Sequence, residues 1–271
     1  MARFCAVHSM QQQQHQHQQQ QKQQQKQQQQ KQQQQKQQQH AFPVQFGDRR
    51  AEGYVLTKSR AVGGRCQALL PFNVRRHWSY RRIEGEEEWS RKRETFVWRG
   101  VTTGSGLRRA YVHAMYRDFD VRFSKVVQHR SDWITDPSQL AKPMKREEML
   151  KYKYVLSLPG NDVATNLKWL LQQDSVVVMP TPSVEGWLLE GLLRPFVHYV
   201  PLDDPANATR VLRWMRDNDE KCRRIAQNAK RWYARVRSFE DVSDVMELFQ
   251  KRKSAHVETR EVLPPSFRDF E

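Results

Sequence analysis

Residues 151–201 alternate short apolar segments with loops and helix-like segments, and this alternation restricts the chain to few folds. The apolar segments are residues 154–158, 176–179 and 197–200. Short, continuously apolar strands are typical of a sheet that is covered on both faces. Strands that alternate with helices predict βαβ units and a mostly parallel sheet. We therefore expect an α/β fold with a Rossmann-like parallel sheet and flanking helices.

Hydrophobic periodicity predicts further elements on both sides of this block. Residues 95–98 and 119–127 are predicted strands, and residues 107–117 and 145–151 are predicted helices. Residues 84–88, which include four glutamates, are predicted to be a solvated acidic loop. Beyond residue 201 the pattern predicts helices over residues 204–218, 220–236 and 238–252.

The first apolar segment leads directly into a glycine turn, Gly160-Asn161, and then into a helix predicted from Asp162. Glycine permits a tight turn and close approach of a ligand, and Asn161 or Asp162 can cap the helix. Thr165 and Asn166 follow on its first turn. A helix N-terminus at a sheet edge binds phosphate, which indicates a nucleotide-type ligand. An ordinary capped turn is the alternative, since neither GxGxxG nor GxxxxGK[ST] is present.

Arginines gather around the predicted strand at residues 95–98. Arg99 and Gly100 end that strand, Thr102 follows, and Arg108 and Arg109 open the next helix. Such arginines can clamp a diphosphate through bidentate hydrogen bonds. An aromatic core strand with surface arginines is the alternative interpretation.

A proline-rich loop at residues 180–183 precedes two glutamates, Glu185 and Glu190, in a segment predicted to be helical. A carboxylate at the carboxyl edge of a sheet can hold ribose or sugar hydroxyls, although solvated helix glutamates are the alternative. His198 is interpreted as a structural histidine on a buried strand. No Ser-His-Asp or Cys-His arrangement and no metal-ligand set can be recognised, so no catalytic residue and no metal site are predicted.

Composition limits the class of protein. Residues 11–39 are almost all glutamine, which cannot form a core, so residues 1–40 are predicted to be a disordered leader. The net charge of +16 is compatible with nucleic acid, acidic membranes or nucleotide sugars. The three cysteines, Cys5, Cys66 and Cys222, form no CxxC pair. No transmembrane segment and no signal peptide are apparent, so either the protein is not secreted or its true N-terminus is missing.

Several linked motifs resemble glycosyltransferase family 90, which contains fungal capsule-associated proteins, bacterial lipopolysaccharide-modifying proteins and animal protein O-glucosyltransferases. The resemblance runs from about residue 55 to residue 234. The motifs, in chain order, are LTKSR (56–60), LPFNVRRHW (70–78), WRGVTTG (98–104), KYKYVLSLPGNDVATNLKWLL (151–171), SVVVMPTPSVEGW (175–187) and LLRPFVHYVPL (192–202).

This resemblance implies a GT-B fold of two Rossmann-like halves, with the nucleotide sugar bound mainly by the C-terminal half. Residues 41–253 would form the family domain, with 41–94 as a shortened N-terminal half, 95–253 as the donor-binding half and 254–271 as a loose tail. It implies transfer of glucose or xylose from a UDP-sugar to a hydroxyl of a glycan or protein, without a metal or other cofactor. The donor contacts would fall on Arg99, Arg108 or Arg109, and residues 160–166.

The chain differs from what the resemblance implies at one residue and in one region. Asn166 stands where the animal enzymes have an arginine, and Lys168 is a candidate replacement. The catalytic carboxylate of the family lies upstream of the WRG motif, where this chain is largely glutamine, so no base is assigned. The alternatives are therefore an inactive nucleotide-sugar-binding protein of the same fold and a basic protein associated with nucleic acid. Eukaryotic relatives imply the ER or Golgi lumen, where the sequon at Asn207 would be glycosylated.

Overall fold

The computed structural model describes residue 23 and residues 25–31, 44–45, 55–64, 67–70 and 82–237. The chain divides into two compact units, Met1–Pro43 and Val44–Glu271. In the first unit, residues 25–31 are helical and exposed. The rest of the predicted leader, the predicted helix at 238–252 and the loose tail lie outside the described residues, as do Cys5 and Cys66. Cys222 is buried and forms no disulfide.

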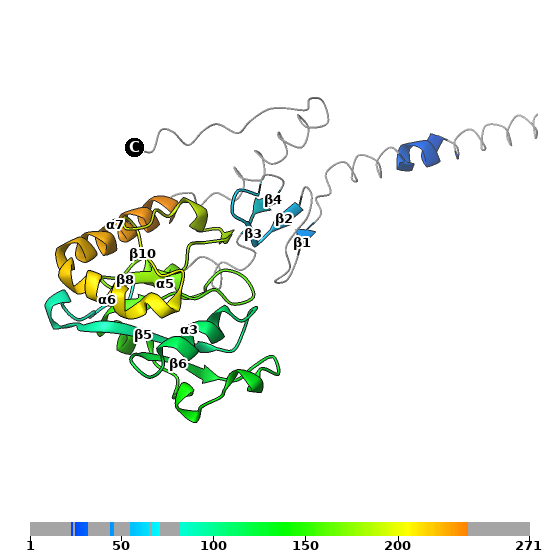
Figure 1. Cartoon of the computed structure of the whole chain (residues 1–271). Helices are drawn as coiled ribbons and strands as arrows, with labels where there is room; N and C mark the ends of the chain where they lie inside the picture. The colour runs from blue at the N-terminus through cyan, green and yellow to red at the C-terminus, as the bar shows by residue number, and fades with distance from the viewer. Residues whose placement is uncertain are drawn as a thin grey trace, which may run out of the picture. The chain divides into compact units, whose positions relative to one another are not determined.

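Five parallel strands form the main sheet of the second unit (Figure 1). In chain order they are β5 (Arg93–Val101), β6 (Asp120–Lys125), β7 (Tyr152–Leu156), β8 (Val176–Met179) and β10 (Val200–Pro201). Their spatial order is β10-β8-β7-β5-β6, and each neighbouring pair is parallel. The chain therefore builds the sheet outward in one direction from β5 and in the other from β7. This reversal makes a topological switch point between β5 and β7.

Helices lie between and after these strands (Figure 1). The main ones are α3 (Leu107–Met115), α5 (Leu167–Leu170), α6 (Ala208–Asp217) and α7 (Asp219–Arg237). The shorter ones are α4 (Arg146–Met149) and the 3₁₀ turns η1 (Trp89–Arg91), η2 (Ser131–Trp133), η3 (Pro137–Gln139), η4 (Glu190–Leu192) and η5 (Pro205–Asn207).

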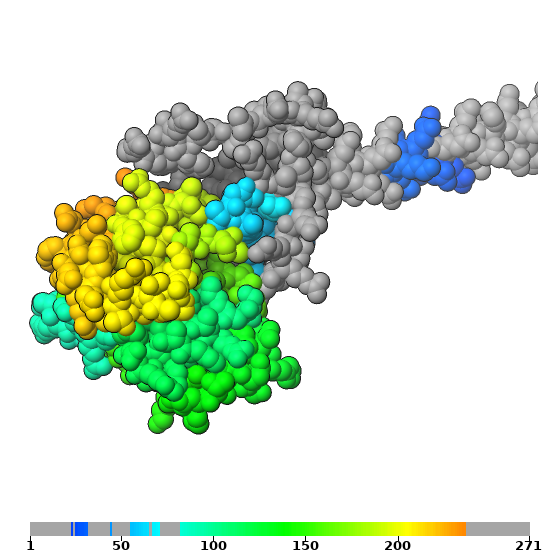
Figure 2. All heavy atoms as spheres, viewed as in Figure 1, coloured from blue at the N-terminus to red at the C-terminus, as the bar shows by residue number. Residues whose placement is uncertain are grey.

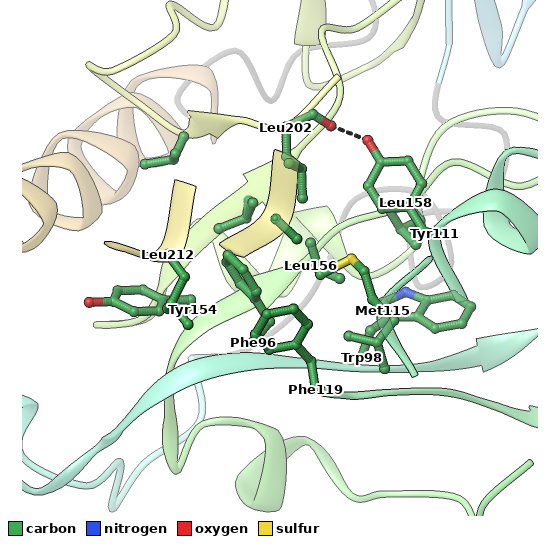
Figure 3. Packing of buried hydrophobic residues seen from close by; sticks show 14 of the residues in the cluster. Phe96, Trp98, Tyr111, Met115, Phe119, Tyr154, Leu156, Leu158, Leu202 and Leu212 are labelled. Carbon is green, nitrogen blue, oxygen red and sulfur yellow. Dashed lines mark hydrogen bonds between the residues drawn. The ribbon is translucent and has the colours of Figure 1, made fainter. Parts of the chain in front are cut away.

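Alternate strand residues point to opposite faces of the sheet and form two hydrophobic clusters. The cluster that contains α3 and α6 includes Phe96, Trp98, Tyr154, Leu156, Tyr111, Met115 and Leu212 (Figure 3). The cluster on the other face contains α5 and includes Val97, Val155, Val177, Leu167, Leu170 and Tyr233. The Tyr111 hydroxyl donates a hydrogen bond to the carbonyl of Leu202, so the buried phenol remains satisfied (Figure 3). Burial on both faces explains why the strand segments are continuously apolar.

Two smaller sheets precede or flank the main one. The strands β1 (Val44–Gln45), β2 (Val55–Thr57) and β4 (Gln67–Leu69) are parallel, in the order β1-β2-β4. The strand β3 (Ser59–Ala61) pairs antiparallel with β9 (Val184–Gly186). In Figure 2 the cyan segment around β3 lies against the yellow-green segment that contains β9. A segment from the start of the domain therefore borders the central block of the sequence.

The sequence predicted that the acidic segment at residues 84–88 is a solvated loop, and this prediction is wrong for Glu86. Its carboxylate forms an ion pair with Lys92, and the two side chains are 4% and 0% exposed. The same carboxylate accepts hydrogen bonds from the backbone N–H of Asp174, and Lys92 donates to the Ser175 hydroxyl at 2.8 Å. This network ties the chain before β5 to the start of β8.

The predicted parallel sheet is confirmed, and the strand at residues 176–179 matches β8. The predicted strand at 154–158 begins and ends two residues earlier, as β7. The predicted helices at 107–117 and 220–236 correspond to α3 and α7. The strand predicted at 197–200 is only β10, which begins at Val200, so His198 precedes it in a turn. There its Nδ1 accepts a hydrogen bond from the backbone N–H of Arg194 at 2.9 Å.

Two predicted helices in the central block are wrong. The helix expected from Asp162 begins only at Leu167 and has four residues. Side chains of the Asn, Asp and Thr type compete with the helical backbone for hydrogen bonds, and Asn166 illustrates this. Its Nδ2 donates to the carbonyl of Leu156 at 2.8 Å, and its Oδ1 accepts from the Ser157 hydroxyl at 3.0 Å. The segment after residue 183 instead forms β9 and η4, because its backbone pairs with β3.

Candidate functional site

A cavity of about 200 Å³ lies at the carboxyl ends of β5 and β7. Val101 and Thr103 line it from the end of β5 and the loop that follows, and Gly160 and Asp162 line it from the loop after β7. These are the two strands between which the strand order reverses. Ligands of open α/β sheets bind in the crevice at such a point, because the loops after the two strands diverge there. The fold therefore places this cavity where a ligand site is expected.

Two glycines bring these loops into contact. Gly104 has a φ of +96°, and a Cβ built on it would lie 2.5 Å from the carbonyl oxygen of Gly160. The backbone N–H of Gly104 also donates to the side-chain oxygen of Asn161 at 3.0 Å. A residue with a side chain would separate the loops at position 104, so glycine is required for the geometry of the cavity.

Arg108 extends from α3 into the wall of this cavity and is only 8% exposed. Its Nε donates to the carbonyls of Leu158 and Pro159, its Nη1 to the carbonyl of Val101 and the hydroxyl of Thr103, and its Nη2 to the carbonyl of Leu158. Guanidinium has five N–H groups, so these contacts leave one Nη2 hydrogen without a partner among the described residues. All of these partners are uncharged.

The charge of Arg108 is therefore not cancelled by a direct ion pair within the described part of the chain. Burial lowers the pKa of Arg108 to about 10, although Asp162 opposes this. The guanidinium stays protonated at neutral pH. A buried cation that is held by neutral oxygens at a cavity wall attracts an anionic ligand.

Other charged side chains complete the wall. Lys58 forms an ion pair with Asp162 at 2.8 Å, and both line the cavity. Lys168, on α5, is 5% exposed and also lines it. With Arg108, three cationic side chains face two carboxyl groups, those of Asp162 and Glu190. The lining is net positive, which favours a phosphate-bearing ligand.

Glu190 differs from the other lining residues, because its carboxyl group is buried and only one of its two oxygens has a hydrogen-bonding partner among the described residues. The side chain is 3% exposed, and its Oε2 accepts a hydrogen bond from the backbone N–H of Gly186 at 2.6 Å. Its Oε1 has no hydrogen-bonding partner among the described residues. Burial raises the pKa of Glu190 to about 7, although the backbone N–H groups of Gly186 and of Glu190 itself, and the charge of Lys168, oppose the shift.

The structure brings five of the predicted site residues together in the cavity lining. They are Arg108, Gly160, Asn161, Asp162 and Thr165. A helix N-terminus contributes nothing at residues 160–162, since α5 begins later. The lining at these residues consists of loop backbone, the Arg108 guanidinium and nearby side chains.

The other predicted site residues lie outside this lining. Arg99 forms an ion pair with Asp120 at 2.5 Å, on the neighbouring strand β6. The Thr102 hydroxyl donates to the carbonyl of Val127 at 2.9 Å, and Arg109 is exposed on α3. A Cβ on Gly100 would lie 2.3 Å from the Trp98 ring, so this glycine accommodates the tryptophan.

Two more of them serve local structure. Asn166 holds the end of β7 through the bonds described above. Glu185 forms an ion pair with Arg60 at 2.8 Å, across the β3–β9 pair. Among the predicted glutamates, it is Glu190 and not Glu185 that lines the cavity.

Sequence reasoning did not assign Lys58 or Thr103 to the site, and it named Glu190 only beside Glu185, as a carboxylate that could hold ribose or sugar hydroxyls. Lys58 and Thr103 lie inside the LTKSR and WRGVTTG motifs, and those motifs were the available signal. Glu190 follows Leu189, whose φ of +51° no local pattern reveals. The described residues contain no group of three or more His, Cys, Asp or Glu side chains that could hold a metal ion. Within the same residues, no helix combines the length and hydrophobicity needed to span a bilayer.

Comparison with known proteins gives a consistent result. The model of glycosyl transferase family 90 matches residues 71–265. The O-glucosyltransferase LpsA of Dichelobacter nodosus is 45% identical over 98 residues, which are 34% of this chain and 31% of that protein. Protein O-glucosyltransferase 3 of Rattus norvegicus is 33% identical over 92 residues, 33% of this chain and 18% of that protein. The O-glucosyltransferase rumi of Drosophila pseudoobscura pseudoobscura is 27% identical over 180 residues, 62% of this chain and 43% of that protein.

These findings, together with the α/β sheet and its cationic cavity, define the class of protein. The chain belongs to glycosyl transferase family 90. It matches less than half of the length of each of these three relatives.

Proposed function

We propose that this chain binds a UDP-sugar at the cavity between β5 and β7 and transfers glucose or xylose to a hydroxyl group of a glycan or protein. Family membership and the three relatives named O-glucosyltransferases support the class of reaction. The net positive lining supports a phosphate-bearing donor.

The geometry of Arg108 is the observation that carries this proposal. Its guanidinium is fixed by the carbonyls of the loops that it joins, and it forms no direct ion pair among the described residues. A fixed cation with one N–H group left is suited to a diphosphate whose negative charge grows as the sugar bond breaks. Because the group is already held in place, little reorganisation is needed at the moment of reaction.

The sheets support a GT-B arrangement as part of the proposal. The five-stranded sheet would form the donor-binding half, which begins at Arg93 of β5 and not at residue 95, and β1-β2-β4 would belong to the N-terminal half, within residues 41–94. The bonds from Glu86 to the backbone N–H of Asp174 and from Lys92 to the Ser175 hydroxyl join the end of this second range to the donor-binding half.

Inverting transfer requires a general base on the acceptor hydroxyl as well as stabilisation of the UDP leaving group. The residues described above supply the second requirement: Arg108 and the loop at residues 160–162 would hold the diphosphate. The base is not assigned to any residue of this chain.

Release of UDP tests the proposed function directly. The purified chain is incubated with UDP-glucose or UDP-xylose, with and without a mixture of hydroxyl-bearing glycan acceptors, and free UDP is measured. We expect saturable release of UDP from at least one donor. Arg109 is exposed and lies next to Arg108 on α3, so Arg109→Ala serves as the matched control for substitutions of Arg108. It should release UDP at the wild-type rate. If folded protein binds UDP but releases none from either donor, the chain is a nucleotide-sugar-binding protein and the proposed transfer is wrong.

A further inference from the structure

A second, smaller cavity of about 80 Å³ adjoins the larger one, and the two share Val163 and Glu190 in their linings. Most of the smaller lining is apolar or proline-rich, and includes Leu107, Ala164, Leu167, Met179, Pro180 and Pro182. The larger cavity has charged walls, whereas this one has the character of a pocket for a flat, weakly polar group. Glu190 therefore lies where a polar and an apolar compartment meet.

The position of Glu190 is enforced by its surroundings. Leu189, immediately before it, has the left-handed backbone conformation at a φ of +51°. Left-handed conformations are unfavourable for a leucine, and such strain persists only where the surroundings impose it. A Cβ on Gly191, immediately after it, would lie 2.8 Å from Oε2 of Glu185 and 2.6 Å from Val62. The turn that carries the carboxyl group is thus fixed from both sides.

Folding alone does not explain why a carboxyl group is kept here. A buried acceptor without a partner costs free energy, and native proteins rarely tolerate one without a reason. Oε2 of Glu190 is engaged by Gly186, but Oε1 has no partner among the described residues. A ligand that donates hydrogen bonds would complete the site.

The order of groups in a nucleoside diphosphate matches the order of these compartments. Its ribose separates a flat base from the charged phosphates, and the ribose hydroxyls are hydrogen-bond donors. We infer that Glu190 contacts the ribose hydroxyls of the donor nucleotide, with the phosphates in the larger cavity and the base in the smaller one. This inference rests on the proposed function, which supplies the nucleotide as ligand.

The charged neighbours of Glu190 come from three elements. Lys168 belongs to α5 and acts on the Glu190 carboxyl as a favourable charge, whereas Glu185 of β9 acts as an unfavourable one. Arg60 of β3 pairs with Glu185 and reduces that effect. Hydroxyl donors from a ligand favour the ionised carboxylate further. Nucleotide binding near pH 7 should therefore release a proton from Glu190.

The test compares UDP with 2′-deoxy-UDP and 3′-deoxy-UDP by isothermal titration at fixed salt concentration. Wild-type protein should bind UDP and should bind at least one deoxy analogue ten times more weakly or worse, because Oε1 would lose its partner. In Glu190→Gln, the amide oxygen still accepts from Gly186, and an NH₂ group replaces the unpartnered oxygen. This variant should bind UDP at least tenfold more weakly and should bind UDP and the deoxy analogues within threefold of one another.

Glu185→Gln is the matched control, because Glu185 lies on the same segment but outside both linings. It should keep the wild-type preference for UDP. Equal wild-type affinity for UDP and both deoxy analogues would overturn the assignment of Glu190 while leaving the proposed function intact. Unchanged affinities in a folded Glu190→Gln would do the same. If wild-type protein binds no UDP, the proposed function itself fails, and the inference fails with it.

Discussion

Gly104 and Gly160 approach so closely that a Cβ on Gly104 would lie 2.5 Å from the carbonyl oxygen of Gly160. Gly104 belongs to the loop after β5 and Gly160 to the loop after β7, the two strands on either side of the switch point. Contact between these glycines therefore sets the distance between the two loops that line the cavity.

Gly104→Ala should destabilise the protein by more than the backbone strain of an alanine at positive φ alone would. The alanine would suffer the backbone strain, about 1–2 kcal/mol, and would also displace the loop at Gly160. Gly106 has a φ of +111° but nothing within 4 Å of its built Cβ, so Gly106→Ala isolates the strain. Urea denaturation should show that Gly104→Ala is less stable than Gly106→Ala by at least about 1 kcal/mol. Equal losses in the two variants would mean that the contact between the loops is unimportant.

Glu190 predicts a specific dependence of stability on pH. Its pKa is raised from 4.5 to about 7 in the folded chain. Between these values the folded chain retains a proton that the unfolded chain has lost, so the free energy of unfolding falls as pH rises. The loss should be complete above pH 7, and a shift of this size corresponds to at most roughly 3 kcal/mol.

Glu190→Gln removes this titration and should therefore become more stable relative to wild type as pH rises. The groups around Glu190, which are Lys168, Glu185 and Arg60, remain in both proteins and their effects largely cancel in the comparison. Urea denaturation at pH 5 and pH 8 measures the difference between variant and wild type. A difference that is the same at both pH values would show that Glu190 does not titrate in this range.

The buried ion pair between Lys92 and Glu86 should be far more important for stability than exposed pairs nearby. Lys92→Met leaves the Glu86 carboxylate without its cation in a buried site, and such a loss typically costs about 3–5 kcal/mol. Arg91 pairs with Glu88, but the two side chains are 68% and 71% exposed, so Arg91→Ala should change stability little. Chemical denaturation of the two variants makes this comparison. Similar small losses in both would contradict the buried role of Lys92.

The sequence predicted the strands of the sheet correctly where the local apolar pattern and the burial of the strand in the fold favour the same structure. Val176–Met179 is a continuous run of apolar residues, and a run of this kind has few alternatives to a buried strand. The glycine turn at residues 160–161 was also correctly assigned to the edge of the sheet, because a strand precedes it.

The pattern failed where distant residues decide the local structure. Val184–Gly186 resembles part of a helix in isolation, but it pairs with Ser59–Ala61, more than a hundred residues earlier. The strand order that creates the switch point is likewise a property of pairing and not of spacing. The half-satisfied carboxyl of Glu190 depends on burial by several elements, so the sequence indicated a glutamate there but not its state.

Arg99 and Arg108 show the same limit for the site. Both arginines lie near the end of β5 in the sequence, and both were predicted to contact the donor. The side chain of Arg99 turns to Asp120 on β6, whereas Arg108 crosses to the loop after β7. We expect Arg99→Ala to reduce stability and to leave UDP affinity within threefold of wild type. A tenfold loss of affinity in folded Arg99→Ala, measured by titration calorimetry, would restore Arg99 to the donor site.

The central claim is that a fixed cation at the switch point holds the diphosphate of a nucleotide. Isothermal titration of the folded chain with UDP and with uridine tests it most directly, because the two ligands differ only in the phosphates. UDP should bind at one site per chain, and uridine should bind at least ten times more weakly, a difference of about 1.4 kcal/mol. Arg109→Ala should not change this preference, whereas Arg108→Lys should reduce it. Equal affinity for uridine and UDP, or no binding of UDP by folded protein, would contradict the claim.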